Sequence, residues 1–528
     1  MTNLLEERGL FVREASGLIK EIGPWSAIFF GLLNTDWGGF VWPAQIPTIM
    51  YPGANVLLMR SIGFFFSLQM GFTFFFLNVA MPRSGGAYVA TSRGYHPFWG
   101  IAEGWRSVIQ NPLFVATGSF FGVQGFGSAL KTAGIIAGVP TLISTGDVLL
   151  TNMPIQIGLS LTCLLFGVLS DALGPGFFKR LTTIGAIVAL LLYGLGWLYS
   201  FSVPLKNLPA RWDETWGAGA YDEIVATAAA NGWQPIKKYS WEASWNSILM
   251  TGSAGGNASN IMAVAGEVSQ PRLSFALAHI GVVLVGSVFT FAHAIPLYTK
   301  FFPFVQQYVF LWHNKIPLTI NQSPMLPPYL PVFWGSLMRR NALLITLYGS
   351  TEFVKSYFSA VGSIYWISRP AFAMAFDRFF PETFSKIHPR FHTPINALYL
   401  STMLGIFWTF FTALTPWSAI LTQGALTMFI QLNLNLACFL FPYFKREVWE
   451  MGLTTTVFGL PAAALNGAIG TCWHTYRMIL GFRGITMTAC LVTAGYQIIA
   501  VIGMIYYLEK AKKRGADPAR IFGMLPPA

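Results

Sequence analysis

The sequence predicts an all-α membrane protein with about twelve transmembrane helices. Of its 528 residues, 54% are hydrophobic and only 10% are charged, whereas soluble domains carry about 25% charged residues. Apolar stretches of about 20 residues, the length that crosses a bilayer as a helix, recur along the whole chain. Two of these stretches, around residues 29–40 and 250–257, are interrupted by glycine.

The apolar stretches divide the chain into twelve predicted spans. Because this number is even, both termini lie on the same side of the membrane. More of the 33 Lys and Arg residues fall on the side of the termini than on the other side, which predicts cytoplasmic termini for a multi-pass protein of the cell membrane. The predicted spans are residues 23–47, 55–80, 98–126, 149–170, 181–203, 243–268, 274–298, 341–368, 394–414, 416–442, 455–476 and 485–508.

The spans and the segments between them give a domain organisation. The two long outer loops, 204–242 and 299–340, are interpreted as a cap over the outer face or, alternatively, as a partner-docking surface. The aromatic residues 301–312 are suited to the membrane interface. The predicted units are a cytosolic segment (1–22), spans one to five (23–203), the first outer loop (204–242), spans six to ten (243–442), spans eleven and twelve (443–508) and a cytosolic tail (509–528).

The remaining composition argues against several function classes. The net charge of +12 reflects cytoplasmic loops rather than nucleic-acid binding. Neither a metal-ligand spacing nor a nucleophile with a partner base is apparent, so we predict no metal, no cofactor and no enzyme activity. The cysteines lie in apolar stretches, where small buried residues are expected rather than disulfides; they are Cys163, Cys438, Cys472 and Cys490.

Three sequence elements, in order, resemble the signatures of the amino acid–polyamine–organocation (APC) superfamily. Residues 81–88 read MPRSGGAY, which is similar to the PRSGGxY element after the second span of that family. Residues 266–272 read GEVSQPR, similar to its GEVxNPxR element at the sixth span. Residues 368–397 resemble the loop between its eighth and ninth spans. The resemblance covers roughly residues 15–510.

This resemblance implies the fold and the mode of action of the family. The fold would be the LeuT fold, in which spans one to five and spans six to ten form a five-plus-five inverted repeat with broken helices 1 and 6, followed here by two extra C-terminal helices. The resemblance also implies a secondary transporter for an amino acid or a related organic amine.

The two glycine-rich breaks are the predicted substrate-binding segments. Lipid cannot hydrogen-bond the backbone groups that a break exposes, so a break persists where it lines a polar cavity or is buried in protein. In transporters, half-helix N-termini at such breaks bind anionic substrate groups. The alternative is that the glycines only permit tight helix packing. The predicted substrate-binding residues are Asn34, Asp36, Trp37, Gly38 and Gly39 in the first span and Gly252, Ser253, Gly255, Gly256 and Asn257 in the sixth.

Asp36 departs from the family pattern, which has a small residue at this position. An ionised side chain inside the membrane is costly and by default indicates a functional site. We predict that Asp36 meets the substrate amine or a coupling cation; the alternative is a solvated position without a ligand.

Span eight carries the candidate residues for ion coupling. Glu352 and Lys355 are three residues apart and share one helix face, as either a structural ion pair or a proton-coupling pair. Ser359 and Ser363 would supply hydroxyls to the LeuT-type sodium site that the resemblance implies, or would stabilise helix contacts. The interpretation of Glu267 with Arg272, and of Glu103 with Arg106, is that of inner-gate or structural pairs.

We therefore predict a permease that works by alternating access, coupled to H⁺ or Na⁺. Its partners would be the small-molecule substrate, the coupling cation and the lipid bilayer, without nucleic acid. The alternatives are an uncoupled facilitator or channel of the same fold, and a non-transporting sensor or structural membrane subunit.

Overall fold

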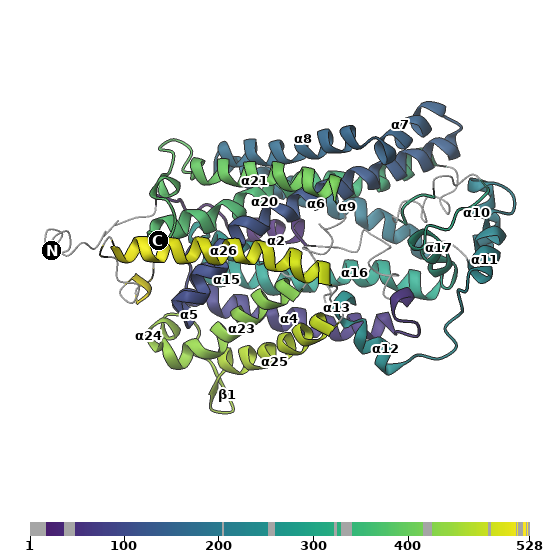
Figure 1. Ribbon diagram of the computed structural model, residues 1–528. Coiled ribbons are helices and arrows are strands. Elements are labelled where there is room, and N and C mark those ends of the chain that lie inside the picture. The colour runs from purple at the N-terminus through teal and green to yellow at the C-terminus, as the bar shows by residue number, and fades with distance from the viewer. Residues whose placement is uncertain are drawn as a thin grey trace.

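The computed structural model of the 528-residue chain describes residues 17–35, 48–202, 205–251, 259–320, 325–328, 341–415, 425–483, 487–513, 515, 521–523 and 525. These residues are predominantly helical (Figure 1). The helices are α2 (Pro24–Leu33), α4 (Val56–Ala80), α5 (Ala87–Gly94), α6 (Pro97–Ala137), α7 (Pro140–Thr151), α8 (Met153–Ala172), α9 (Pro175–Ser202), α10 (Leu208–Trp216), α11 (Ala220–Ala230), α12 (Trp241–Asn246), α13 (Ile248–Thr251), α14 (Asn260–Ala263), α15 (Pro271–Phe275), α16 (Val282–Thr299), α17 (Phe304–His313), α19 (Ala342–Gly349), α20 (Thr351–Phe376), α21 (Ile395–Leu414), α23 (Ala425–Phe444), α24 (Arg446–Glu450), α25 (Ala462–Arg483) and α26 (Met487–Lys513).

Shorter elements complete the described chain. A two-stranded antiparallel hairpin, β1 (Thr456–Val457) and β2 (Leu460–Pro461), precedes α25. It is a small departure from the predicted all-α architecture, and its turn residue Phe458 is almost fully exposed. The 3₁₀ turns are Leu205–Asn207, Ala265–Glu267 and Glu382–Ser385, and a π-helical turn, Ala276–Gly281, joins α15 to α16.

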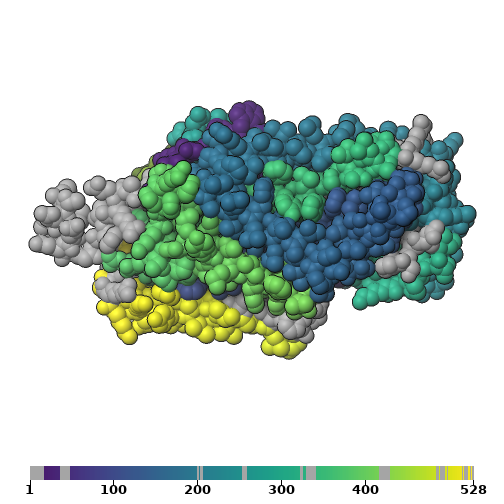
Figure 2. Space-filling model, turned by 90° about the horizontal axis from the view of Figure 1, so that it is seen from above, coloured from purple at the N-terminus to yellow at the C-terminus, as the bar shows by residue number. Residues whose placement is uncertain are grey.

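Six stretches of helix among the described residues are long and apolar enough to cross a membrane. They are Val56–Ala80, Pro97–Ala137, Met153–Ala172, Pro175–Leu198, Pro271–Thr299 and Ile395–Leu414. Large apolar side chains stay exposed on several of them, including Leu169 on α8, Leu191 on α9 and Met403 on α21. Figure 2 shows one long face of the molecule, covered largely by the blue segment that includes α7, α8 and α9. Such apolar helix surfaces suit contact with lipid.

The predicted third span is much shorter than the helix that forms there. α6 runs from Pro97 to Ala137 rather than ending at residue 126, and α7 follows it. Gly138 takes a left-handed conformation that ends α6, and Pro140 begins α7, as glycine and proline commonly do at helix ends. The Lys131 ammonium lies 2.7 Å from the Asp147 carboxylate and joins the two helices. The fourth span begins at Met153, not at residue 149.

The other predicted spans differ mainly at their ends. The fifth span begins six residues early, because Pro175 starts α9 directly after the turn at Gly174. The eighth extends through α20 to Phe376. Around the predicted breaks, α2 ends at Leu33, α13 ends at Thr251 and α14 begins at Asn260.

The two long outer loops pack against each other. α10 and α11 come from the first loop and α17 from the second, and all three lie at one end of the molecule in Figure 1. Trp212 and Trp216 are fully buried in a shared apolar cluster with Phe304 and Tyr308. Phe301, Phe304 and Tyr308 of the second loop, from the stretch that sequence analysis assigned to the membrane interface, are buried in this unit of α10, α11 and α17, called here the helical cap.

A carboxylate ties the two loops together. Glu223 on α11 accepts hydrogen bonds from the Thr319 hydroxyl and backbone N–H and, at 3.1 Å, from the Ile320 N–H. Although partial burial opposes the effect, these hydrogen bonds hold the pKa of Glu223 below its usual value.

The side chains of three of the four cysteines are described, and all three are free thiols. Cys163 and Cys438 are buried as expected, whereas Cys472 is exposed on α25.

Close packing of α9 against α19 gives a stability prediction. A methyl group on Gly196 would lie 1.9 Å from the Tyr348 ring, whereas one on Gly194 would have open space around it. We expect Gly196→Ala to destabilise the fold by about 1 to 3 kcal/mol through overpacking, with Gly194→Ala as the matched control. The measurement is the thermal unfolding midpoint of the detergent-purified protein, and equal midpoints for the two variants would contradict the α9–α19 contact.

Candidate functional site

The first predicted break begins where α2 ends, at Asn34. The Asn34 amide nitrogen donates to the Phe30 carbonyl at 3.0 Å, and the Thr35 hydroxyl donates to the Leu32 carbonyl at 3.0 Å. Short polar side chains often satisfy the last carbonyls of a helix in this way. The chain therefore leaves helical geometry at the residue that sequence analysis assigned to substrate binding.

One face of α20 meets this helix end. The hydroxyls of Ser359 and Ser363 both donate to the Asn34 Oδ1 atom, at 3.3 and 2.7 Å. Gly362 lies between the two serines, and a methyl group there would come within 2.3 Å of Asn34 Nδ2. The glycine thus permits the close approach of α2 and α20 that brings the three polar side chains together.

Lys355 lies one turn before Ser359, on the same face of α20. Its side chain is buried, and its ammonium lies 5.8 Å from the centre of the Tyr193 ring on α9. This distance is within the range of cation–π attraction. The face of α20 that meets Asn34 therefore carries Lys355, Ser359 and Ser363. It brings together residues from two separate parts of the predicted site.

The other predicted site residues lie outside the described part of the structure. The side chain of Glu352 also lies outside it, although its backbone belongs to α20. These assignments stay predictions; the remaining residues are Asp36, Trp37, Gly38 and Gly39 of the first break and Gly252, Ser253, Gly255, Gly256 and Asn257 of the second.

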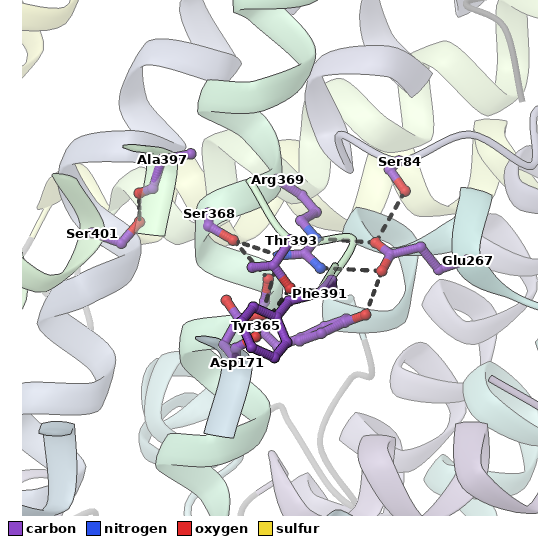
Figure 3. A network of polar contacts seen from close by, with 10 residues as sticks. All are labelled: Ser84, Asp171, Glu267, Tyr365, Ser368, Arg369, Phe391, Thr393, Ala397 and Ser401. Atoms are coloured by element: carbon purple, nitrogen blue, oxygen red, sulfur yellow. Dashed lines mark hydrogen bonds and ion pairs between the residues drawn. The ribbon is translucent and has the colours of Figure 1, made fainter. Parts of the chain in front are cut away.

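A second polar centre lies at the other end of α20 (Figure 3). The guanidinium of Arg369 binds both carboxylate oxygens of Glu267, at 3.0 and 3.1 Å, and lies 3.5 Å from Asp171 on α8. All three side chains are almost completely buried. Two opposing carboxylates and one guanidinium thus join α8, α20 and the 3₁₀ turn after α14.

Tyrosine and serine groups complete the coordination of Glu267. The Tyr365 hydroxyl donates to one of its oxygens, and the Ser84 hydroxyl approaches the other at 3.5 Å. The Arg369 guanidinium stacks over the Tyr365 ring at 3.9 Å. These contacts satisfy both oxygens of the Glu267 carboxylate, whose burial would otherwise be costly.

The structure corrects the expected partner of Glu267. Arg272 is exposed, and the carboxylate instead pairs with Arg369, which lies 102 residues away in the chain. Sequence analysis missed Asp171, although an acidic residue at the end of an apolar span was a usable signal. The expected pair within the third span is confirmed, since Arg106 binds Glu103 at 2.8 Å.

The three motifs of the sequence converge beside this network. Arg93, after the first motif, binds Asp377 of the third at 2.7 Å, and Tyr88 donates to the same carboxylate at 2.5 Å. The Gly85 N–H donates to the Ala263 carbonyl at 2.8 Å, just before the second motif. Conformational freedom matters at Gly85, whose φ of 130° disfavours any residue with a side chain. The motifs are therefore one spatial unit, called here the charged layer: Arg93 with Asp377, and Arg369 with Glu267 and Asp171.

Removing one partner of the charged layer tests its contribution to stability. We expect Glu267→Gln to cost about 3 to 5 kcal/mol, because it leaves Arg369 with incomplete charge compensation in a buried site. The exposed pair Arg446–Glu450 provides the control, since Glu450→Gln should cost about 0 to 1 kcal/mol. Thermal unfolding in detergent measures both, and comparable losses would contradict a specially stabilised buried pair.

Comparisons with known proteins identify the family of this chain. The profile of the amino acid permease family matches residues 22–508. The serine/threonine exchanger SteT of Bacillus subtilis (strain 168) is 23% identical over 415 residues, which cover 74% of this chain and 77% of the exchanger. The family match spans the end of α2, the charged layer and all three motifs. The chain therefore belongs to the amino acid permease family, within the APC superfamily that its motifs indicated, and is a multi-pass membrane transport protein rather than an enzyme.

Proposed function

We propose that this protein is a secondary active transporter that carries an amino acid or a related amine across the cell membrane by alternating access. The observation that carries the proposal is the contact of Asn34 with Ser359 and Ser363. It joins the end of the first helical segment to α20 at the start of a predicted break, inside a chain of the amino acid permease family.

The helix end at Asn34 carries a partial charge of the sign that suits the ammonium group of an amino acid. The last carbonyls of α2 carry partial negative charge, which favours a substrate ammonium. Asp36, two residues further on, would add a full negative charge. Half-helix N-termini beyond the breaks would favour the carboxylate. The two ends of a zwitterion would thus be bound by opposite helix ends.

The charged layer would serve as the closure on the cytosolic side. It joins α20 to the turn that follows α14, so opening a path along the sixth span requires separating Glu267 from Arg369. A closed and an open arrangement of such a layer are the two states that alternating access needs, and substrate shifts their populations through its different affinity for each. With cytoplasmic termini, the helical cap would lie on the outer side.

The proposal also includes the coupling of substrate transport to H⁺ or Na⁺. Lys355, with Glu352, would carry a proton, whereas Ser359 and Ser363 would contribute oxygen atoms to a sodium site. The similarity to a serine/threonine exchanger favours a second candidate, exchange of one amino acid for another without a coupling cation. An uncoupled facilitator and a non-transporting sensor are the competing functions that the experiment must separate from these two.

Reconstitution into proteoliposomes distinguishes the four functions. We expect labelled serine to accumulate when unlabelled serine is inside, and to accumulate further under an inward gradient of H⁺ or Na⁺. Lys355→Met should abolish stimulation by H⁺ if the proton is coupled. Uptake that requires internal amino acid and ignores both gradients would establish exchange, uptake that never exceeds equilibrium would establish a facilitator, and serine binding without flux would indicate a sensor.

Loss of one hydroxyl tests the contact between α2 and α20. Ser363→Ala removes the shorter hydrogen bond to Asn34. We expect the apparent substrate affinity to weaken about two- to tenfold, because one hydrogen bond contributes about 0.5 to 1.5 kcal/mol. Ser356→Ala, on the same helix, removes a hydroxyl that bonds Gly118 instead and serves as the control. Concentration-dependent uptake measures both variants, and an unchanged Ser363→Ala curve would remove this contact from the site.

A further inference from the structure

A groove lies between α9 and α19. Its volume is about 310 Å³, and its walls include Leu192, Leu195 and Leu198 of α9 and Leu344 and Leu347 of α19. Among its described lining residues, only Ser202 and Tyr348 carry a polar side chain. An ordered water needs several polar partners, so the groove is suited to an apolar occupant.

The groove opens on the face of α9 that meets lipid. Exposed apolar side chains recur every three or four residues along this helix, and such residues share one helix face; they are Ile184, Ile187, Leu191, Leu195 and Leu198. α9 is one of the long apolar helices of a multi-pass membrane protein, so this stripe faces the bilayer. Two walls of the groove, Leu195 and Leu198, belong to the stripe, and the groove is therefore accessible to lipid.

The groove extends from the headgroup region into the hydrocarbon core. α9 has 28 residues and ends at Ser202. Its length is therefore about 42 Å, which matches the roughly 40 to 45 Å of a bilayer with its headgroup regions. The α9 wall of the groove begins at Leu192 and ends at Ser202, so it reaches about 15 Å inward from the headgroup level. This depth and this polarity fit one acyl chain of a phospholipid.

A lysine is held at the headgroup end of the groove. The Lys300 ammonium donates to the Phe201 carbonyl at 2.6 Å and lies 5.5 Å from the centre of the Phe201 ring. Phe201 directly precedes Ser202, which lines the groove. An ammonium has three N–H donors, and the ion pairs of the described residues do not include Lys300. The end of the groove therefore carries a positive charge that suits an anionic headgroup.

We propose that this groove binds one anionic phospholipid, with an acyl chain between α9 and α19 and the headgroup at Lys300. Lipid tails are as apolar as leucine, so the acyl chain alone gives little preference among phospholipids. The preference comes from charge, because one lysine near an anionic lipid surface strengthens binding about fivefold. Since α9 leads into the helical cap, the lipid belongs to the leaflet on that side. The proposal does not depend on the transport function.

Titration of delipidated protein with two lipids tests the headgroup contact. The full-length protein in detergent receives phosphatidylglycerol or phosphatidylcholine with the same acyl chains, and the rise in the thermal unfolding midpoint reports binding. We expect wild-type protein to bind phosphatidylglycerol about fivefold more tightly than phosphatidylcholine. Lys300→Gln should remove most of this preference. Lys237→Gln, which removes an exposed lysine between α11 and α12, should retain it.

Substitutions on α9 test the acyl-chain contact separately. Leu195→Trp places a larger ring in the groove and should weaken the binding of both lipids together. Leu191→Trp places the same ring on the exposed stripe but outside the lining of the groove, and both lipids should bind it as they bind wild-type protein. Glycerol phosphate, which has the headgroup charge without acyl chains, should leave the midpoint unchanged.

Four results would overturn the proposal. Wild-type protein that binds both lipids equally would do so even if every variant fails to fold. A folded Lys300→Gln protein that keeps the full preference would remove Lys300 from the site, and a folded Leu195→Trp protein with unchanged binding would place the lipid outside this groove. A midpoint that rises with glycerol phosphate as it does with phosphatidylglycerol would indicate a site for a free anion instead of a lipid.

Discussion

The burial of Arg369 between Glu267 and Asp171 constrains the arrangement of several helices at one end of this protein. A guanidinium with no access to water is tolerated only where carboxylates and further hydrogen bonds compensate it. These partners come from α8, from α20 and from the turn after α14, so the three elements must meet in one arrangement. The adjacent Ile22 backbone pairs with Glu267 and Ser269, and therefore the start of the first span is placed by the same unit.

Different interactions stabilise the two ends of the molecule. The charged layer relies on ion pairs with defined geometry, which favour discrete arrangements rather than gradual deformation. The helical cap relies on a large apolar cluster around Trp212 and Trp216. One carboxylate, Glu223, hydrogen-bonds across its two loops. Ion pairs that can exchange partners are suited to a layer that opens, whereas an apolar cluster is suited to a cover that stays assembled.

Between these ends, polar and charged side chains lie beside the described helices that lead into the two predicted breaks. The serine hydroxyls and the Asn34 amide are neutral hydrogen-bonding groups, Lys355 adds a buried cation on the same helix face, and Arg477 adds another beside the sixth span. In a membrane interior each such charge is costly.

The sequence by itself determined the class of protein and its family, and it located the six long apolar helices of the described structure. A helix that crosses a bilayer needs about 20 apolar residues, so composition and span length are visible in the sequence. Each of the three motifs is a continuous stretch of the chain and can be recognised without the fold. Periodicity also identified the pair Glu103 and Arg106, because residues three apart share one helix face whatever the rest of the fold does.

Tertiary structure alone decided which faces of different helices meet. Nothing in the local pattern distinguishes Arg272 from Arg369 as the partner of Glu267, and Asp171 enters the layer from a third helix. Likewise, the serines of α20 reach Asn34 only because Gly362 lets two helices approach closely. Local sequence sets the order of side chains on one helix, but the contacts between helices are set by the packing of the whole chain.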